Sequence, residues 1–88
     1  MPHVPHPLAE DFPGMADRLR RLQGLDVHFA RICDEYLELN RAIHRAETGL
    51  VPTDDFRLAV MRRNRLLLKD KITARLARND AAAEAPGG

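Results

Sequence analysis

The sequence predicts an all-α fold in which two long helices form an antiparallel coiled-coil hairpin, preceded by a short helical extension. Two observations predict this fold. Apolar residues recur at alternating spacings of three and four along two stretches, which keeps them on one face of a helix. Between the stretches, Gly49 and Pro52 end one helix and leave a connection short enough to turn the next one back. We expect such hairpins to oligomerise into a helical bundle.

The chain divides into a flexible proline-rich arm over residues 1–14, a helical hairpin domain over 15–78 and a disordered tail over 79–88. Four of the six prolines lie in the arm, and proline fixes φ and lacks an amide donor. The tail consists mainly of small residues and ends in Pro-Gly-Gly. Neither end is therefore expected to form regular structure.

A short helix is expected over residues 15–23, with Leu19 and Leu22 on one side. Gly24 weakens a helix interior, and Asp26 is a favourable N-cap residue. A break at Gly24 to Leu25 is therefore favoured over one helix continuous with the next.

The first long helix is predicted over residues 27–48, the turn over 49–53 and the second long helix over 54–78. Gly49 suits the left-handed position that ends a helix, with Leu50 as its apolar contact. Thr53 is expected to cap the second helix. The two helices should meet along a hairpin seam formed by Phe29, Ile32, Tyr36, Leu39, Ile43, Leu58, Met61, Arg65, Leu68 and Ile72.

The second helix carries another apolar row, nearly opposite the seam. At 100° per residue its members fall within about 40° of one another, and they are Phe56, Val60, Leu67 and Ala74. We call this row the second apolar face. A lone helical hairpin is marginally stable, so we expect the face to bind a second copy of the chain or a helix of another protein. Two alternatives are that the stretch containing Leu19 and Leu22 covers it, or that it simply faces water.

Composition narrows the functional classes. The chain has 14 Lys and Arg against 13 Asp and Glu, so it has no general attraction to nucleic acid or anionic lipid. Its apolar runs fall far short of the roughly 20 residues that span a bilayer. Its one cysteine cannot form an internal disulfide, and its start does not resemble a secretory signal. We expect a cytoplasmic protein without a membrane segment.

Residues able to carry chemistry are few. His28 and His44 are separated by about 24 Å along one helix, too far to share a metal ion within one chain. His3 and His6 lie in the arm, where they could chelate only weakly. Cys33 is expected to be an apolar filler beside the stripe, since adjacent acidic residues oppose a thiolate.

No nucleophile triad or glycine-rich phosphate loop occurs in the sequence. We therefore expect no enzyme activity, no catalytic residues, no metal, no cofactor and no small-molecule substrate.

The second helix is nevertheless rich in Arg and Lys, which makes a nucleic-acid-associated regulator the alternative function. Its possible contacts are Arg62, Arg63, Lys69 and Lys71. These side chains point in different directions around the helix and form no single phosphate-binding stripe. Arg62, Arg65 and Lys69 could instead pair with Glu35 and Glu38 across the hairpin.

Arg65 has two interpretations. It could lay its stem on the core and extend its guanidinium to Tyr36 or Glu35 at the edge. It could instead act as a polar seam position that sets register or oligomer number.

Two stretches carry a family resemblance. Residues 26–47, which begin Asp-Val-His-Phe-Ala-Arg-Ile, and residues 66–72, Leu-Leu-Leu-Lys-Asp-Lys-Ile, resemble the YdcH-like family of small bacterial proteins of unknown function. The resemblance implies a coiled-coil hairpin in a bacterial cytoplasm and no established activity. The chain departs from the family pattern at Leu67, where lysine is usual, and at Lys71, where an acid is usual. Both lie on or beside the second apolar face.

Overall fold

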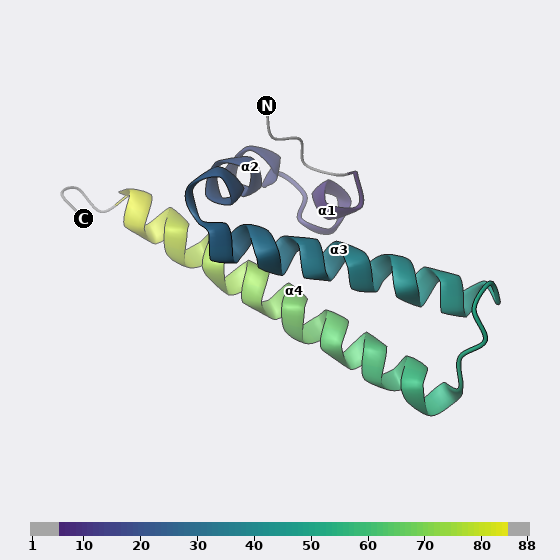
Figure 1. The fold of residues 1–88 in the computed structure, drawn as a ribbon. Coiled ribbons are helices and arrows are strands. Elements are labelled where there is room, and N and C mark those ends of the chain that lie inside the picture. The colour runs from purple at the N-terminus through teal and green to yellow at the C-terminus, as the bar shows by residue number, and fades with distance from the viewer. Residues whose placement is uncertain (1–5, 85–88) are drawn as a thin grey trace.

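Two long antiparallel helices form the body of the molecule (Figure 1). A computed structural model describes the backbone of residues 6–84 and the side chains of residues 8–78. Helix α3 runs from Val27–Glu47, helix α4 runs from Asp55–Glu84, and the two pack along each other. The predicted all-α fold is confirmed, because the described residues form helices and no strand.

Helix α3 ends as its glycine predicts. Gly49 has φ +81°, a backbone conformation that residues with a Cβ atom rarely adopt. The Leu50 amide donates to the Arg45 carbonyl at 2.9 Å and the Gly49 amide donates to the Ala46 carbonyl at 3.3 Å. These are the two bonds of a Schellman motif. The expected apolar contact is absent, since Leu50 is 73% exposed.

Helix α4 is capped by Asp54, not by the predicted Thr53. The Arg57 amide donates to Asp54 Oδ1 at 2.7 Å, whereas the Thr53 hydroxyl donates to the Val51 carbonyl. The helix also continues to Glu84, past the predicted end at residue 78. Alanines at 81–83 favour helix, and the first helix-breaking residue is Pro86. Residues 85–88 of the expected tail lie outside the described residues.

The N-terminal segment differs most from expectation. Residues 1–14 were expected to form a flexible arm, but helix α1 occupies His6–Asp11. Pro7 lies in its first turn, where the missing amide hydrogen breaks no helical bond. Leu8 and Phe12 are four residues apart and both are buried, so tertiary packing orders a stretch of weak intrinsic helix propensity. Residues 1–5 of the expected arm lie outside the described residues.

Helix α2 spans Ala16–Leu25, and one residue, Asp26, separates it from α3. The break lies at Asp26, which has an extended backbone with φ −131° and ψ 105°. Gly24 remains inside α2, so the expected break at Gly24 to Leu25 is displaced toward the cap residue. Asp26 Oδ1 accepts the Phe29 amide at 3.1 Å, which starts α3 in a new direction.

The core lies at the end of the hairpin away from the loop, where α1 and α2 sit on α3 (Figure 1). Its buried members come from all four described helices and the α1–α2 connection. They are Leu8, Phe12, Leu19, Leu22, Phe29, Cys33, Tyr36, Leu37, Ile72 and Leu76. Toward the loop the ribbons of α3 and α4 separate, and Ile43 is buried there outside this cluster.

Replacing Leu8 with alanine tests the docking of α1. Leu8 is fully buried, so its truncation should lower the free energy of unfolding by about 3 kcal/mol through lost burial and a residual cavity. Leu25→Ala is the matched control, because Leu25 is 76% exposed and its truncation should change stability by less than about 0.5 kcal/mol. Urea denaturation followed by circular dichroism measures both. Equal effects of the two substitutions would contradict the packing of α1.

Candidate interaction surface

The ten predicted seam residues differ in how deeply they are buried. Four of the ten are buried, namely Phe29, Tyr36, Ile43 and Ile72. The other six are half-buried, and these are Ile32, Leu39, Leu58, Met61, Arg65 and Leu68. Most of the partly exposed ones lie toward the loop, where the helices separate (Figure 1). The seam is therefore most completely buried near α1 and α2.

Leu37 was not anticipated by the sequence reasoning, and with Cys33, expected as an apolar filler beside the stripe, it forms a second buried row on α3. Cys33 and Leu37 lie one turn apart beside the seam, and both are buried in the core cluster with Leu19 and Leu22 of α2. The signal was present, because Phe29, Cys33 and Leu37 follow at intervals of four and widen the apolar stripe. Helix α2 therefore covers α3 and leaves the second apolar face of α4 open.

The Cys33 thiol is enclosed by this packing. Burial raises its pKa to about 12, and the nearby Asp34 charge acts in the same direction. At neutral pH the group is an uncharged thiol, which agrees with its expected place as an apolar filler.

Tyr36 joins α1 to the hairpin. Its hydroxyl donates to the Asp11 carboxylate, and its ring lies 6.1 Å from the Phe12 ring between centroids. Burial, together with the Asp11 carboxylate, raises the pKa of the Tyr36 hydroxyl. On the other side, the Lys69 ammonium of α4 lies 6.0 Å from the Phe12 ring centroid. Phe12 thus contacts both long helices.

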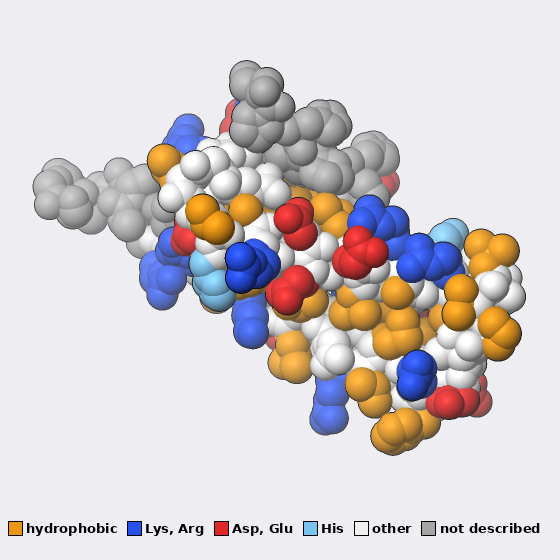
Figure 2. Space-filling model, in the orientation of Figure 1, with side chains coloured by type: hydrophobic (Ala, Val, Ile, Leu, Met, Phe, Trp, Pro, Cys, Tyr) orange, Lys and Arg blue, Asp and Glu red, His pale blue; other side chains and the backbone are white. Residues whose placement is uncertain are grey.

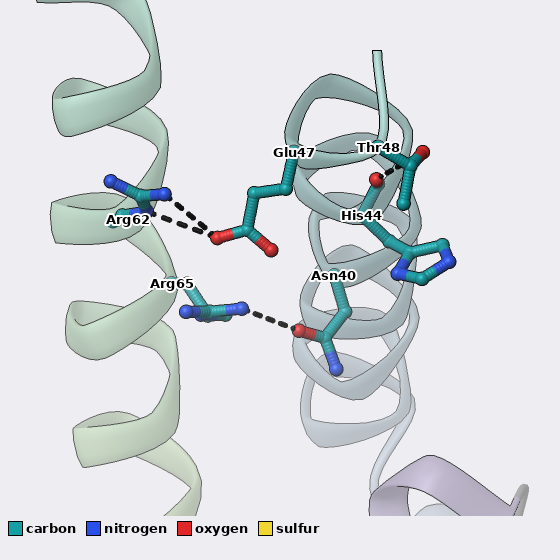
Figure 3. A network of polar contacts seen from close by, with 6 residues as sticks. All are labelled: Asn40, His44, Glu47, Thr48, Arg62 and Arg65. Carbon is teal, nitrogen blue, oxygen red and sulfur yellow. Dashed lines mark hydrogen bonds and ion pairs between the residues drawn. The ribbon is translucent and has the colours of Figure 1, made fainter. Parts of the chain in front are cut away.

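Two polar contacts bridge α3 and α4 near the loop (Figure 3). Arg62 donates to Glu47 Oε2 at 2.8 and 3.3 Å, and Arg65 donates to Asn40 Oδ1 at 3.0 Å. These partners replace the expected Glu35, Glu38 and Tyr36. Side chains on a helix lean toward its N-terminus, so α4 side chains lean toward the loop and those of α3 lean away from it. At the loop end, the α3 partners of Arg62 and Arg65 consequently lie about a turn or more nearer the loop than expected, whereas at the other end Arg75 meets Asp26 without this shift.

The ion pair between Asp26 and Arg75 closes the opposite end of the hairpin. Asp26 caps α3 with one carboxylate oxygen and accepts a hydrogen bond from Arg75 of α4 with the other. The Arg75 hydrogen bond is the main cause that lowers the pKa of Asp26. In the same way, Arg62 lowers the pKa of Glu47 at the loop end. The two long helices are therefore joined by an ion pair at each end.

The residues of the second apolar face are exposed to solvent. Phe56 is 80% exposed, Leu67 is 53% exposed, and Val60 and Ala74 are also exposed. Leu66 on α4, together with Leu50 and Val51 of the loop, adds further exposed apolar area that the sequence reasoning did not assign to a site. Figure 2 shows hydrophobic side chains gathered over the loop end of the hairpin.

The four candidate nucleic-acid contacts do not act as one group. Arg62 is held by Glu47, and Lys69 lies over the Phe12 ring. Arg63 and Lys71 are exposed. The basic side chains of α4 are thus split between internal contacts and solvent, and no continuous phosphate-binding stripe results.

The candidate metal ligands are likewise dispersed. His28 and His44 are exposed near opposite ends of α3. Among the described residues, no group of three or more His, Cys, Asp and Glu side chains lies close enough to hold a metal ion. The side chains of His3 and His6 lie outside the described part of the chain.

No described helix has the length and apolar character needed to cross a membrane.

Comparison with known proteins identifies a family that matches the hairpin. A family described as "Protein of unknown function (DUF465)" matches residues 29–76, which is more than half of the chain. The matched region covers most of α3 and α4 and leaves α1 and α2 outside. Neither the curated proteins nor the solved structures contain a match.

The ion pair between Asp26 and Arg75 should make the stability of the fold depend on pH. A lowered pKa in the folded state stabilises the fold above the unfolded pKa of about 3.9, and this stabilisation is lost as pH falls through the folded pKa. Asn caps helices as well as Asp does, so Asp26→Asn removes mainly the charge that pairs with Arg75. We expect a lower Tm for the variant at pH 7, and Tm values that converge as the pH falls through the folded pKa of Asp26, because the protonated carboxyl is then uncharged like the amide. A Tm difference between the wild type and the variant that persists at low pH would contradict a stabilising charge interaction between Asp26 and Arg75.

Proposed function

The chain belongs to the DUF465 family, the YdcH-like proteins of unknown function, and we propose that it is a small interaction module that self-associates through the second apolar face. The family has no described activity that could be assigned to the chain. Its mechanism is burial of this face of α4 against a partner helix. The proposed partner is a second copy of the chain. A helix of another protein is the alternative partner.

The exposure of the second apolar face carries the proposal. Phe56 and Leu67 lie more than half in water although α1, α2 and α3 pack closely elsewhere. Burying a side chain of this size contributes about 1.5–3 kcal/mol relative to leaving it exposed. From Phe56 to Ala74 the row runs about 27 Å along α4, long enough to accept several turns of a helix.

The position of α2 strengthens this argument. Leu19 and Leu22 pack on α3 next to Cys33 and Leu37, so they do not cover the second apolar face. The described part of the chain therefore offers this face no occupant of its own. Binding to another molecule supplies the burial that the chain itself does not.

The alternative, a nucleic-acid-associated regulator that uses α4, has weaker support. Arg62 and Lys69 already have partners within the chain, which they would have to leave in order to bind phosphates. Arg63 and Lys71 remain, and they flank the second apolar face instead of forming a stripe of their own.

Paired aspartates test the second apolar face directly. We expect the wild type to sediment as a dimer or larger species at micromolar concentration, and Val60→Asp with Leu67→Asp to sediment as a 10 kDa monomer. Ala59→Asp with Thr73→Asp is the matched control, since it places the same charges at exposed positions of α4 outside this face. A wild type that sediments only at 10 kDa and melts cooperatively would contradict the proposal.

A further inference from the structure

Side-chain size along the second apolar face indicates the direction of the partner. The face has a phenylalanine ring at one end, Phe56, and only a methyl group at the other, Ala74. In a parallel pair, the two rings would hold the helices apart at one end and leave a gap at the other. In an antiparallel pair, each ring lies toward the end of the face where the partner has its smallest residue, and the helix separation is more even.

The charges beside the second apolar face support the same direction. Arg63 and Asp70 are seven residues apart, so they lie within about 20° of each other on one flank of the face. Both are exposed, and neither forms an ion pair with another described residue. In an antiparallel helix pair like flanks meet, as e meets e′ in a coiled coil. Pairing centred near Leu67 therefore places each Arg63 beside the partner's Asp70, twice.

Lys71 lies on the other flank of the second apolar face. In the antiparallel pair it would lie near the partner's Asn64, which carries no charge. In a parallel pair opposite flanks meet, so Lys71 would lie beside the partner's Asp70 and Arg63 beside the partner's Asn64. The two directions therefore depend on different charges, which an experiment can separate.

The two directions also place α1 and α2 differently. Both helices lie at the end of the hairpin away from the loop (Figure 1). A parallel pair would bring the two α1–α2 units to the same end. An antiparallel pair places each unit at the end where its partner has its loop.

We propose that two copies pair antiparallel along the second apolar face of α4, with Arg63 of each copy beside Asp70 of the other. The inference rests on the proposed self-association and adds its direction, its register and the charged residues that specify it. Because the contact is self-complementary, it closes into a two-fold dimer instead of growing into a filament.

Charge reversal tests the register. Arg63→Glu alone places two acidic side chains opposite each other at both contacts, and Asp70→Arg alone places two arginines there. Each variant should self-associate about tenfold more weakly than the wild type at low salt. Mixed together, the two variants restore both attractive contacts, so native mass spectrometry of the equimolar mixture should show the heterodimer in excess over either homodimer. The double variant Arg63→Glu, Asp70→Arg in one chain should dimerise as the wild type does.

A mixture of Lys71→Glu with Asp70→Arg is the matched control. Lys71→Glu changes the net charge as much as Arg63→Glu does, but it lies on the other flank, so this mixture should not restore wild-type affinity. Unchanged helicity by circular dichroism shows that each exposed substitution leaves the fold intact.

The possible outcomes separate this inference from the function on which it rests. A wild-type dimer whose Arg63→Glu and Asp70→Arg variants pair statistically, without excess heterodimer, overturns the antiparallel register and leaves self-association standing. Loss of dimer on Lys71→Glu alone indicates the parallel pair and likewise overturns the inference. A monomeric wild type overturns both proposals.

Discussion

Burial of α3 on two sides is the constraint on which the rest of the structure depends. Phe29 and Tyr36 face α4 across the seam, while Cys33 and Leu37 extend the apolar surface toward α1 and α2. A helix with so wide an apolar face cannot be covered by one neighbour. The N-terminal helices therefore complete the core, and Phe12 joins them to both long helices through Tyr36 and Lys69.

This arrangement leaves α4 with an unequal share of the packing. Its seam side meets α3, but the helices that complete the core sit on α3 and not on α4. The second apolar face consequently remains in water, and the pairs Asp26–Arg75 and Glu47–Arg62 join α4 to α3 at the two ends. An exposed apolar row on a helix is the kind of surface that binds another helix.

Much of the hairpin could be predicted from periodicity and helix-end chemistry. The spacing of Phe29, Tyr36 and Ile43 predicts the seam, and Gly49 predicts the end of α3, because these signals are local. Helix α1 could not be predicted in this way, since its prolines indicate an arm and only the contacts of Leu8 and Phe12 with distant helices order it. The partner of Arg65 was also misplaced, because residue numbering alone ignores the lean of helical side chains.

The exposed site was partly predictable for the same reason. Helical angles alone separate Phe56, Val60 and Leu67 from the seam, and the structure places them in solvent. The loop residues Leu50 and Val51 could not be assigned, because their exposure depends on how far the helices separate at the turn.

Hydrogen–deuterium exchange of the intact chain at two concentrations tests the account most directly. At a concentration where the chain is monomeric, amides at 33–37 in α3 should exchange slowest, and those at 56–67 in α4 much faster, because one side of that segment faces water. Raising the concentration should slow exchange at 56–67 and leave 33–37 unchanged. Equal protection of the two segments in dilute solution, or exchange at 56–67 that does not depend on concentration, would contradict it.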